Sequence, residues 1–239
     1  MKKGLAFFLL SFFLIVGCKK KKDNITEPTE QADHYSGDTI DVVRYGVPKF
    51  ILINYCELEK IHRISKFRSG FGHDYSDNFE NCLSMKHYFE FHDSVDWASV
   101  KIFSPIAGTI NNIYYEWAGA KLQITSKDHP AIYIEIFHID TLRTFTIGDT
   151  VKAGEQLGTH VGNQTDSDIA IGVQTPNGRK LVSYFDVMSD GLFEQYQLRG
   201  VAHRNSCIIS QQARNADTLK CNGERFLNSG QTPNWVVLN

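Results

Sequence analysis

The sequence carries no strong charge of either sign and no paired-cysteine motif. Its 25 Lys and Arg residues nearly balance 27 Asp and Glu residues, for a formal net charge of −2, so nothing in the charge indicates nucleic-acid binding. None of the five cysteines belongs to a C-x-x-C pair, which argues against a thiolate zinc site. A glycine-rich phosphate loop is also absent, and the serine and lysine of "SMKHYF" are two residues apart rather than three. The sequence therefore lacks the usual signs of P-loop and serine–lysine acyl-enzyme chemistry.

Helical periodicity is scarce before residue 190, whereas short strand-like runs joined by turns are frequent. "AKLQITS" and "AIYIEIFHI" flank the turn candidate "KDHP", and "DIAIGVQT" and "KLVSYFDVM" flank "PNG". Closely spaced strands of this kind indicate an antiparallel sheet. We therefore expect an all-β domain at residues 41–189, followed by an irregular C-terminal extension at residues 190–239.

The N-terminal segment "MKKGLAFFLLSFFLIVGC" reads as an export signal, with two lysines before a short apolar run. Its end, "IVGC", resembles the lipobox of bacterial lipoproteins. That resemblance implies a signal peptide at residues 1–17, lipid on Cys18 and a membrane-anchored protein of the bacterial cell envelope, in the periplasm or on the outer surface. An ordinary signal peptide with an unrelated cysteine is the alternative. The polar residues 18–40 would then form a flexible tether.

Four cysteines remain after Cys18, and in an exported chain they favour two disulfides. Cys207 and Cys221 are close in sequence, so we expect them to pair and to staple the C-terminal extension. Cys56 would then pair with Cys82. The sequence alone leaves three pairings open.

The stretch "FTIGDTVKAGEQLGTHVGNQ", residues 145–164, is punctuated by Gly148, Gly154 and Gly158. Glycines so placed predict a tight arch between strands. With "SPIAGTINNI" and "AIYIEIFHID", the stretch resembles the core of the M23 peptidase family, also called LytM or lysostaphin-like domains. The resemblance covers roughly residues 65–190 and implies an antiparallel sheet that holds a zinc ion.

In that family, a histidine and an aspartate four residues apart are zinc ligands, and the resemblance assigns these roles to His73 and Asp77 in "HDYSD". Imidazole and carboxylate are suitable zinc ligands. The family's glycine between them is Tyr75 here, which would alter the local backbone. In the alternative interpretation, Asp77 caps a turn and His73 is merely exposed.

The resemblance also places His138 where the family has a catalytic histidine. The family ends with a histidine–x–histidine pair on one strand face, whose first member is the catalytic base or its orienter and whose second member is the third zinc ligand. The matching residues here are Asp168 and Ala170. The resemblance therefore gives the catalytic position to Asp168. Alanine has no donor atom, so we expect His73 and Asp77 to be the remnant of a zinc site. His87, His92, His160 and Asp168 remain as possible replacement ligands.

Three functions follow from this interpretation. The first is an envelope lipoprotein with a degenerate M23-like domain that binds peptidoglycan or regulates a cell-wall hydrolase and needs no cofactor. The second is an active zinc metallopeptidase that cleaves cell-wall peptides with an altered third ligand. The third is a structural surface lipoprotein that uses the sheet only as a scaffold.

Overall fold

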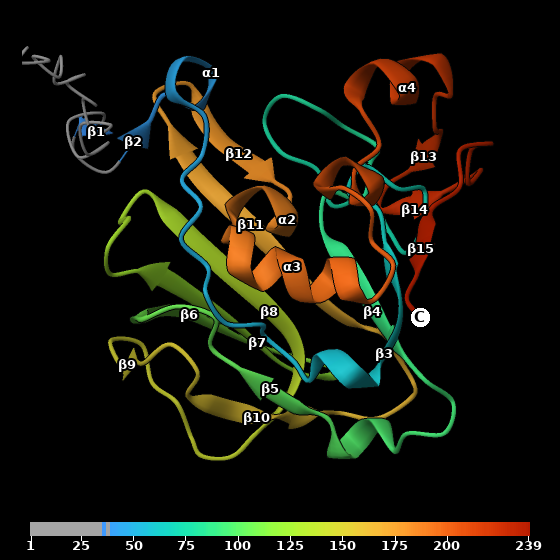
Figure 1. The fold of residues 1–239 in the computed structure, drawn as a ribbon. Coiled ribbons are helices and arrows are strands. Elements are labelled where there is room, and N and C mark those ends of the chain that lie inside the picture. The colour runs from blue at the N-terminus through green and yellow to red at the C-terminus, as the bar shows by residue number, and fades with distance from the viewer. Residues whose placement is uncertain (1–34, 37–38) are drawn as a thin grey trace, which may run out of the picture. The chain divides into compact units, whose positions relative to one another are not determined.

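Antiparallel strands dominate the fold, which confirms the all-β class predicted from the sequence (Figure 1). The computed structural model describes residues 35–36 and 39–239. The predicted signal peptide, Cys18 and most of the predicted tether therefore lie outside the described residues. Within the described part of the chain, no helix is long and apolar enough to cross a membrane.

Eleven strands of the described residues form one large sheet, with the main order β15-β3-β4-β11-β8-β7-β6-β9. β10 pairs with β8 and β5, and β12 pairs with β11. The strands of this sheet are β3 (Ile61–Ser65), β4 (His87–Phe91), β5 (Lys101–Phe103), β6 (Gly108–Glu116), β7 (Gly119–Ser126), β8 (Ile132–Thr141), β9 (Thr150–Val151), β10 (Gln156–His160), β11 (Ser167–Thr175), β12 (Gly178–Val182) and β15 (Trp235–Val237). The smaller pairs are β1 (Tyr35–Ser36) with β2 (Thr39–Ile40) and β13 (Cys221–Asn222) with β14 (Arg225–Phe226). The helices are α1 (Val42–Tyr45), α2 (Tyr184–Val187), α3 (Asp190–Leu198) and α4 (Gln211–Ala216).

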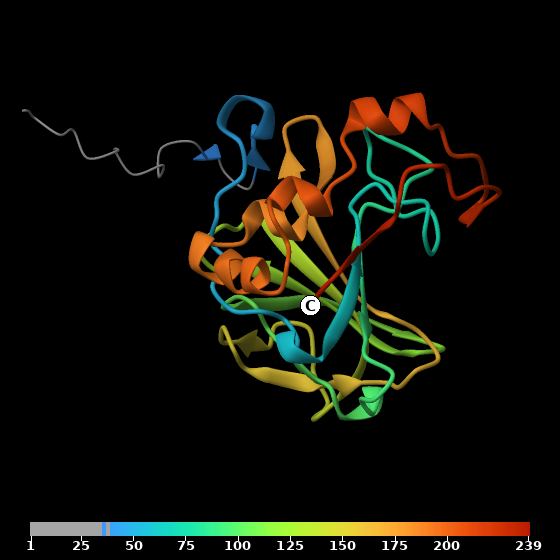
Figure 2. The same ribbon diagram turned by 45° about the vertical axis from the view of Figure 1, so that its right-hand side comes forward.

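Side chains that alternate along each strand give the sheet two different faces. On β11, Ile169 and Ile171 belong to the large core, which also contains buried residues of α2 and α3. These two helices lie over that face of the sheet (Figures 1 and 2). Ala170 belongs instead to a smaller apolar cluster that includes Phe137. The smaller cluster lies beside the cleft described below.

The glycine-rich arch forms as the sequence predicts, although its glycines serve two different purposes. Gly148 and Gly154 have φ values of 98° and 80°, a left-handed backbone that glycine adopts without the steric cost of a Cβ. Gly158 lies within β10, where a Cβ would meet the Asp140 carbonyl oxygen at 2.1 Å. Its absent side chain therefore allows β10 to pair closely with β8.

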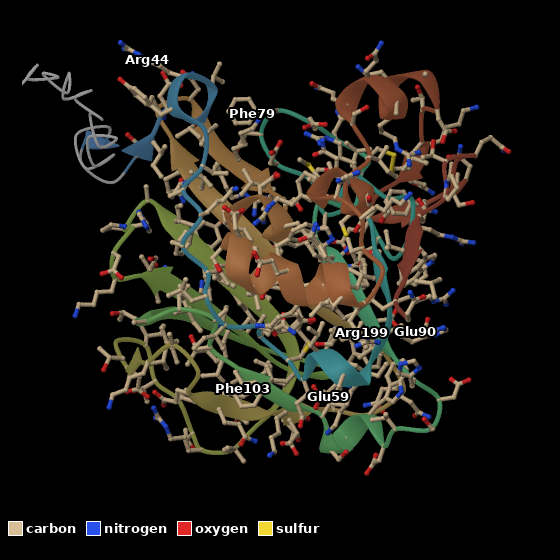
Figure 3. All side chains as sticks on the ribbon, in the orientation of Figure 1. Arg44, Glu59, Phe79, Glu90, Phe103 and Arg199 are labelled. Atoms are coloured by element: carbon tan, nitrogen blue, oxygen red, sulfur yellow. A yellow bond between two sulfur atoms is a disulfide. The ribbon has the colours of Figure 1, made fainter. Side chains whose placement is uncertain are left out.

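The C-terminal residues are built into the β domain, and they contain two helices that the sequence pattern did not predict. α3 buries Leu192, Phe193 and Tyr196 in the large core, and β15 pairs with β3. Arg199, just after α3, donates to the carbonyl oxygens of Leu58 at 2.6 Å and Ile61 at 2.8 Å (Figure 3). The extension thus completes both the core and one edge of the sheet.

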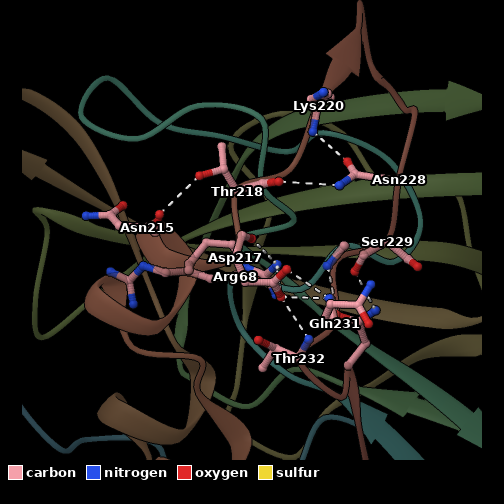
Figure 4. Close-up of polar contacts among 12 residues, drawn as sticks. Arg68, Asn215, Asp217, Thr218, Lys220, Asn228, Ser229, Gln231 and Thr232 are labelled. Carbon is pink, nitrogen blue, oxygen red and sulfur yellow. Dashed lines mark hydrogen bonds and ion pairs between the residues drawn. The ribbon is translucent and has the colours of Figure 1, made fainter.

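Asp217, after α4, organises the segment between α4 and β15 (Figure 4). Its carboxylate accepts hydrogen bonds from the backbone amides of Gln231 at 2.9 Å and Thr232 at 2.8 Å. These amides and the Arg214 charge hold the pKa of Asp217 down at about 2. The carboxylate is therefore ionised at neutral pH, and it holds the chain at Gln231 and Thr232, between the β13–β14 hairpin and β15.

The disulfide pairing expected from the sequence is wrong. Cys82 pairs with Cys221 across 139 residues of chain, which joins the β13–β14 hairpin to the loop before β4. Cys56 and Cys207 are buried free thiols, and both belong to the large apolar core. Proximity in sequence misled the prediction because Cys207 points into the core, whereas Cys221 lies in a hairpin outside it.

We expect the Cys18→Ser protein to expose two reactive thiols when it is denatured without reductant. The native protein should expose none, because burial raises the pKa of both thiols, that of Cys207 to about 12. Titration with a thiol reagent before and after denaturation measures both numbers. A count of zero or four after denaturation would contradict the observed pairing.

Candidate functional site

A cleft of about 720 Å³ opens beside the smaller apolar cluster. Its lining includes residues of the loop that carries Phe71 and His73, and the tip of the β6–β7 hairpin, with Trp117. Lys86, just before β4, and His138, on β8, also line the cleft. The side chains that the sequence analysis assigned to a site come together here only in part.

His138 reaches the cleft because β8 contains a bulge. Phe137 and His138 lie between the pairs Ala120↔Ile139 and Leu122↔Ile136, so two residues of β8 face one residue of β7. His138 has a φ of 62°, which is rare for a residue with a side chain. Such bulges re-aim a side chain and recur next to functional sites. The bulge is the local device that turns the His138 ring toward β11.

The ring of His138 lies between two acceptors. Nδ1 is 3.0 Å from the carbonyl oxygen of Ala118 in the hairpin tip, so Nδ1 must carry a proton and donate it. Nε2 is 3.1 Å from Oδ1 of Asp168. Burial lowers the pKa of His138, but the hydrogen bond to Asp168 and the Asp168 charge outweigh it and raise the pKa overall. The geometry therefore favours an imidazolium ring.

Asp168 is a buried anion, and the charged groups of this region are arranged around it. Its side chain is fully inaccessible, and its other oxygen, Oδ2, forms an ion pair with the Lys86 ammonium, whose side chain is only 1% exposed. Burial raises the pKa of Asp168, but the charges of Lys86 and His138 lower it overall. Burial lowers the pKa of Lys86, but the Asp168 charge raises it overall. Both groups are therefore ionised.

Aromatic rings and one histidine complete the surroundings of the Lys86 ammonium. Nζ lies 4.1 Å from the ring centre of Phe137, 4.8 Å from that of Tyr88 and 5.0 Å from that of Tyr75. It also lies 3.2 Å from Nε2 of His73. Ring faces attract cations, and buried lysines are rare unless they are paired. Lys86 has a carboxylate, an imidazole and three rings around it.

His73 is oriented by its neighbour. Nδ1 lies 3.1 Å from the carbonyl oxygen of Asp74 and must donate to it, so the lone pair of the neutral ring is on Nε2. That lone pair faces the Lys86 ammonium. The ring thus has the orientation of a metal-binding histidine, with its N–H fixed by a carbonyl, but its free nitrogen accepts from an ammonium.

Asp77 has a different role from the one that the family resemblance implies. Its Oδ1 accepts from the amides of Phe79 at 2.8 Å and Glu80 at 2.9 Å, and its Oδ2 accepts from the amide of Leu181 on β12 at 2.8 Å. The carboxylate therefore caps a turn and attaches that turn to the edge of β12. This is the alternative interpretation of Asp77 considered for the sequence.

The other candidate ligands are held elsewhere. Both ring nitrogens of His87 are engaged, by the Ser65 carbonyl at 2.7 Å and the Ser183 hydroxyl at 2.8 Å. His92 stacks on His62 with ring centres 5.2 Å apart. His160 is fully buried, and burial lowers its pKa to about 4.

The donor set does not fit zinc. Ala170, at the position of the missing third ligand, is buried in the smaller apolar cluster. Among the described residues, no group of three or more His, Cys, Asp or Glu side chains is placed to hold a metal ion. Zinc sites in proteins use three or four such ligands.

Sequence reasoning did not identify Lys86 or Tyr75 as part of the cleft. A lysine beside a strand that is otherwise buried, in "SMKHYFEF", was the available signal for Lys86. Tyr75 replaces the family's glycine, and its hydroxyl donates to Glu135 on β8. The side chain thus fills part of the cleft floor with an aromatic ring.

Asp168→Asn should lower the free energy of unfolding by about 3–5 kcal/mol, because it leaves the buried Lys86 ammonium without its carboxylate. Urea denaturation measures the change. Asp166→Asn, two residues earlier and outside the ion pair, is the matched control and should cost less than about 1 kcal/mol. If both substitutions lower the free energy of unfolding by similarly small amounts, the Lys86–Asp168 ion pair does not have the stabilising role assigned to it.

Comparisons with known proteins return solved structures but neither a family model nor a curated protein that matches. Sixteen chains of solved structures match. One is described as a glycyl-glycine endopeptidase, LytM, from Ruminococcus gnavus, with 17% identity, 43% coverage of each chain and a TM-score of 0.34. Lysostaphin matches with 12% identity, 46% coverage of this chain, 47% of its own and a TM-score of 0.30.

The M23 metalloprotease pseudoalterin from the deep sea matches with 17% identity, 55% coverage of this chain, 74% of its own and a TM-score of 0.36. The chain spans less than half the length of the first two proteins. All three names belong to the family that the glycine-rich stretch resembles. TM-scores this low transfer no activity, substrate or site residue to this chain. The chain is similar to these LytM-like structures over the parts that match, and its antiparallel class rests on the pairing of its own strands.

Proposed function

We propose that this chain is a non-catalytic module of the bacterial cell envelope that binds peptidoglycan. Binding is either its whole function or the means by which it regulates a cell-wall hydrolase. One observation carries the proposal: the cleft is present, but Ala170, which stands where the family resemblance expects the third donor, has no donor atom and is packed among apolar side chains of the smaller cluster. A hydrolase of this family would need a metal-activated water there. A binding module needs only the cleft.

The cleft has the mixture of groups that a binding site for a polar polymer uses. Trp117 is 79% exposed on its wall, where an aromatic face is free to stack on a sugar ring or a peptide plane. The Lys121 ammonium, 3.8 Å from Glu135, and the His138 ring supply polar groups. The cleft, of about 720 Å³, has room for more than one sugar or amino-acid residue.

The proposal places the chain on a membrane through lipid on Cys18. The support is the sequence "IVGC" after a short apolar run, a cysteine context that resembles a lipobox. Residues 18–40 would then let the β domain reach cell-wall material near the membrane. A lipid anchor and a wall-binding cleft on one chain are consistent with a role at the cell envelope.

Co-sedimentation of the purified protein with insoluble peptidoglycan tests the proposal. Wild-type protein should sediment without clearing the suspension. Trp117→Ala should weaken binding about fivefold or more, because it removes an exposed aromatic contact in the cleft. Tyr115→Ala is the matched control: Tyr115 is 72% exposed on the same hairpin but lines a different depression.

Loss of turbidity with wild-type protein would refute the non-catalytic role. Failure to sediment, or equal effects of the two hairpin substitutions, would refute binding through the cleft.

A further inference from the structure

Lys86 lies at the point where His73 and Asp168 converge. Its Nζ is 3.2 Å from Nε2 of His73 and in ion-pair contact with Oδ2 of Asp168. These two donors face one common point, and an ammonium occupies that point. The arrangement differs from a merely incomplete metal site, in which the donors would face solvent.

The contacts of Lys86 are those that a metal ion would otherwise make. A zinc ion binds imidazole nitrogen and carboxylate oxygen at about 2.0–2.2 Å. An ion at that distance from both donors would overlap the ammonium nitrogen. It would also place a double positive charge against a single one in a buried environment, where charges interact more strongly than in water. The ammonium and a divalent metal therefore exclude each other.

We propose that the Lys86 ammonium is the permanent cation of this cleft: it takes the position of a divalent metal between His73 and Asp168 and keeps metal out. The lysine neutralises Asp168 and occupies the lone pair of His73, as a metal would. It also fills the space among Phe137, Tyr75 and Tyr88. The site is therefore complete without a metal. Its disagreement with the zinc chemistry of the resembling family follows from the Lys86 ammonium that is present as well as from the donor that Ala170 does not supply.

Removing the ammonium should leave the same two donors free to bind a metal ion weakly, with water in the remaining coordination positions. In Lys86→Ala, Nε2 of His73 and Oδ2 of Asp168 would face a vacated space that water and a zinc ion can enter. Ala170→His alone, the repair that the sequence pattern suggests, leaves the ammonium in place and should gain nothing. The lysine, and not only the missing histidine, controls metal binding.

Zinc binding of purified full-length protein tests the proposal, by isothermal titration with zinc chloride followed by metal analysis after dialysis. Wild type should retain well under one zinc per chain, and Lys86→Ala should bind zinc at least about tenfold more tightly. The added affinity should disappear in the His73→Ala, Lys86→Ala double variant. Lys121→Ala is the matched control, since it removes another cleft ammonium that lies beside Glu135, and it should stay at the wild-type level.

Stoichiometric zinc in wild type, or a folded Lys86→Ala protein without added affinity, would overturn the proposal. If Lys86→Ala does not fold, ¹⁵N NMR of the His73 ring in the wild-type protein tests the proposal instead. The Nε2 signal should not move when one equivalent of zinc is added, and a shift typical of metal binding would overturn the proposal. These outcomes are independent of peptidoglycan sedimentation, so failure of the binding function and failure of this inference are distinguishable.

Discussion

The Lys86 ammonium and the Asp168 carboxylate are buried against each other beneath the cleft, and the neighbouring polar groups take their arrangement from that pair. Asp168 receives Lys86 on one oxygen and His138 on the other. Lys86 in turn donates toward His73. A buried carboxylate is costly unless it is paired, and here two cations share it. The pair therefore links β11, β8 and the residues before β4 through charge.

Covalent and backbone features of the fold hold this charge cluster in place. The bulge in β8 turns His138 toward Asp168 and lets its other nitrogen donate to the β6–β7 hairpin tip. Asp77 and the Cys82–Cys221 disulfide fix the part of the β3–β4 loop that follows His73. The cleft is thus bounded by segments that are attached to the sheet at several points. Such preorganisation favours binding, because little ordering remains to be done when a ligand arrives.

The sequence was sufficient for the features that depend on local pattern. Alternating strands predicted the sheet, and Gly148 and Gly154 marked turns whose backbone requires glycine. The family resemblance singled out His138 and Asp168 as candidate catalytic residues, and the structure places the two side chains 3.1 Å apart. The resemblance did not reveal that the two side chains pair with each other, because the bulge that aims His138 has no clear signature in "IFHID".

Contacts between residues far apart in the chain could not be predicted from the sequence. Asp77 has the spacing of a metal ligand, but its carboxylate is used by amides on its own turn and on β12, 104 residues away. Cys82 and Cys221 are 139 residues apart, whereas Cys207 looked the nearer partner. Lys86 looked like an ordinary polar residue beside a strand. Only the three-dimensional convergence of β4, β11 and the His73 loop shows that its ammonium occupies the shared point of two donors.

A crystal structure of the wild-type protein grown with zinc, with anomalous data collected at the zinc absorption edge, tests the central claim most directly. The account predicts continuous density for the Lys86 side chain between His73 and Asp168 and no anomalous peak in the cleft. A zinc peak bonded to Nε2 of His73, with Lys86 displaced from Asp168, would contradict it.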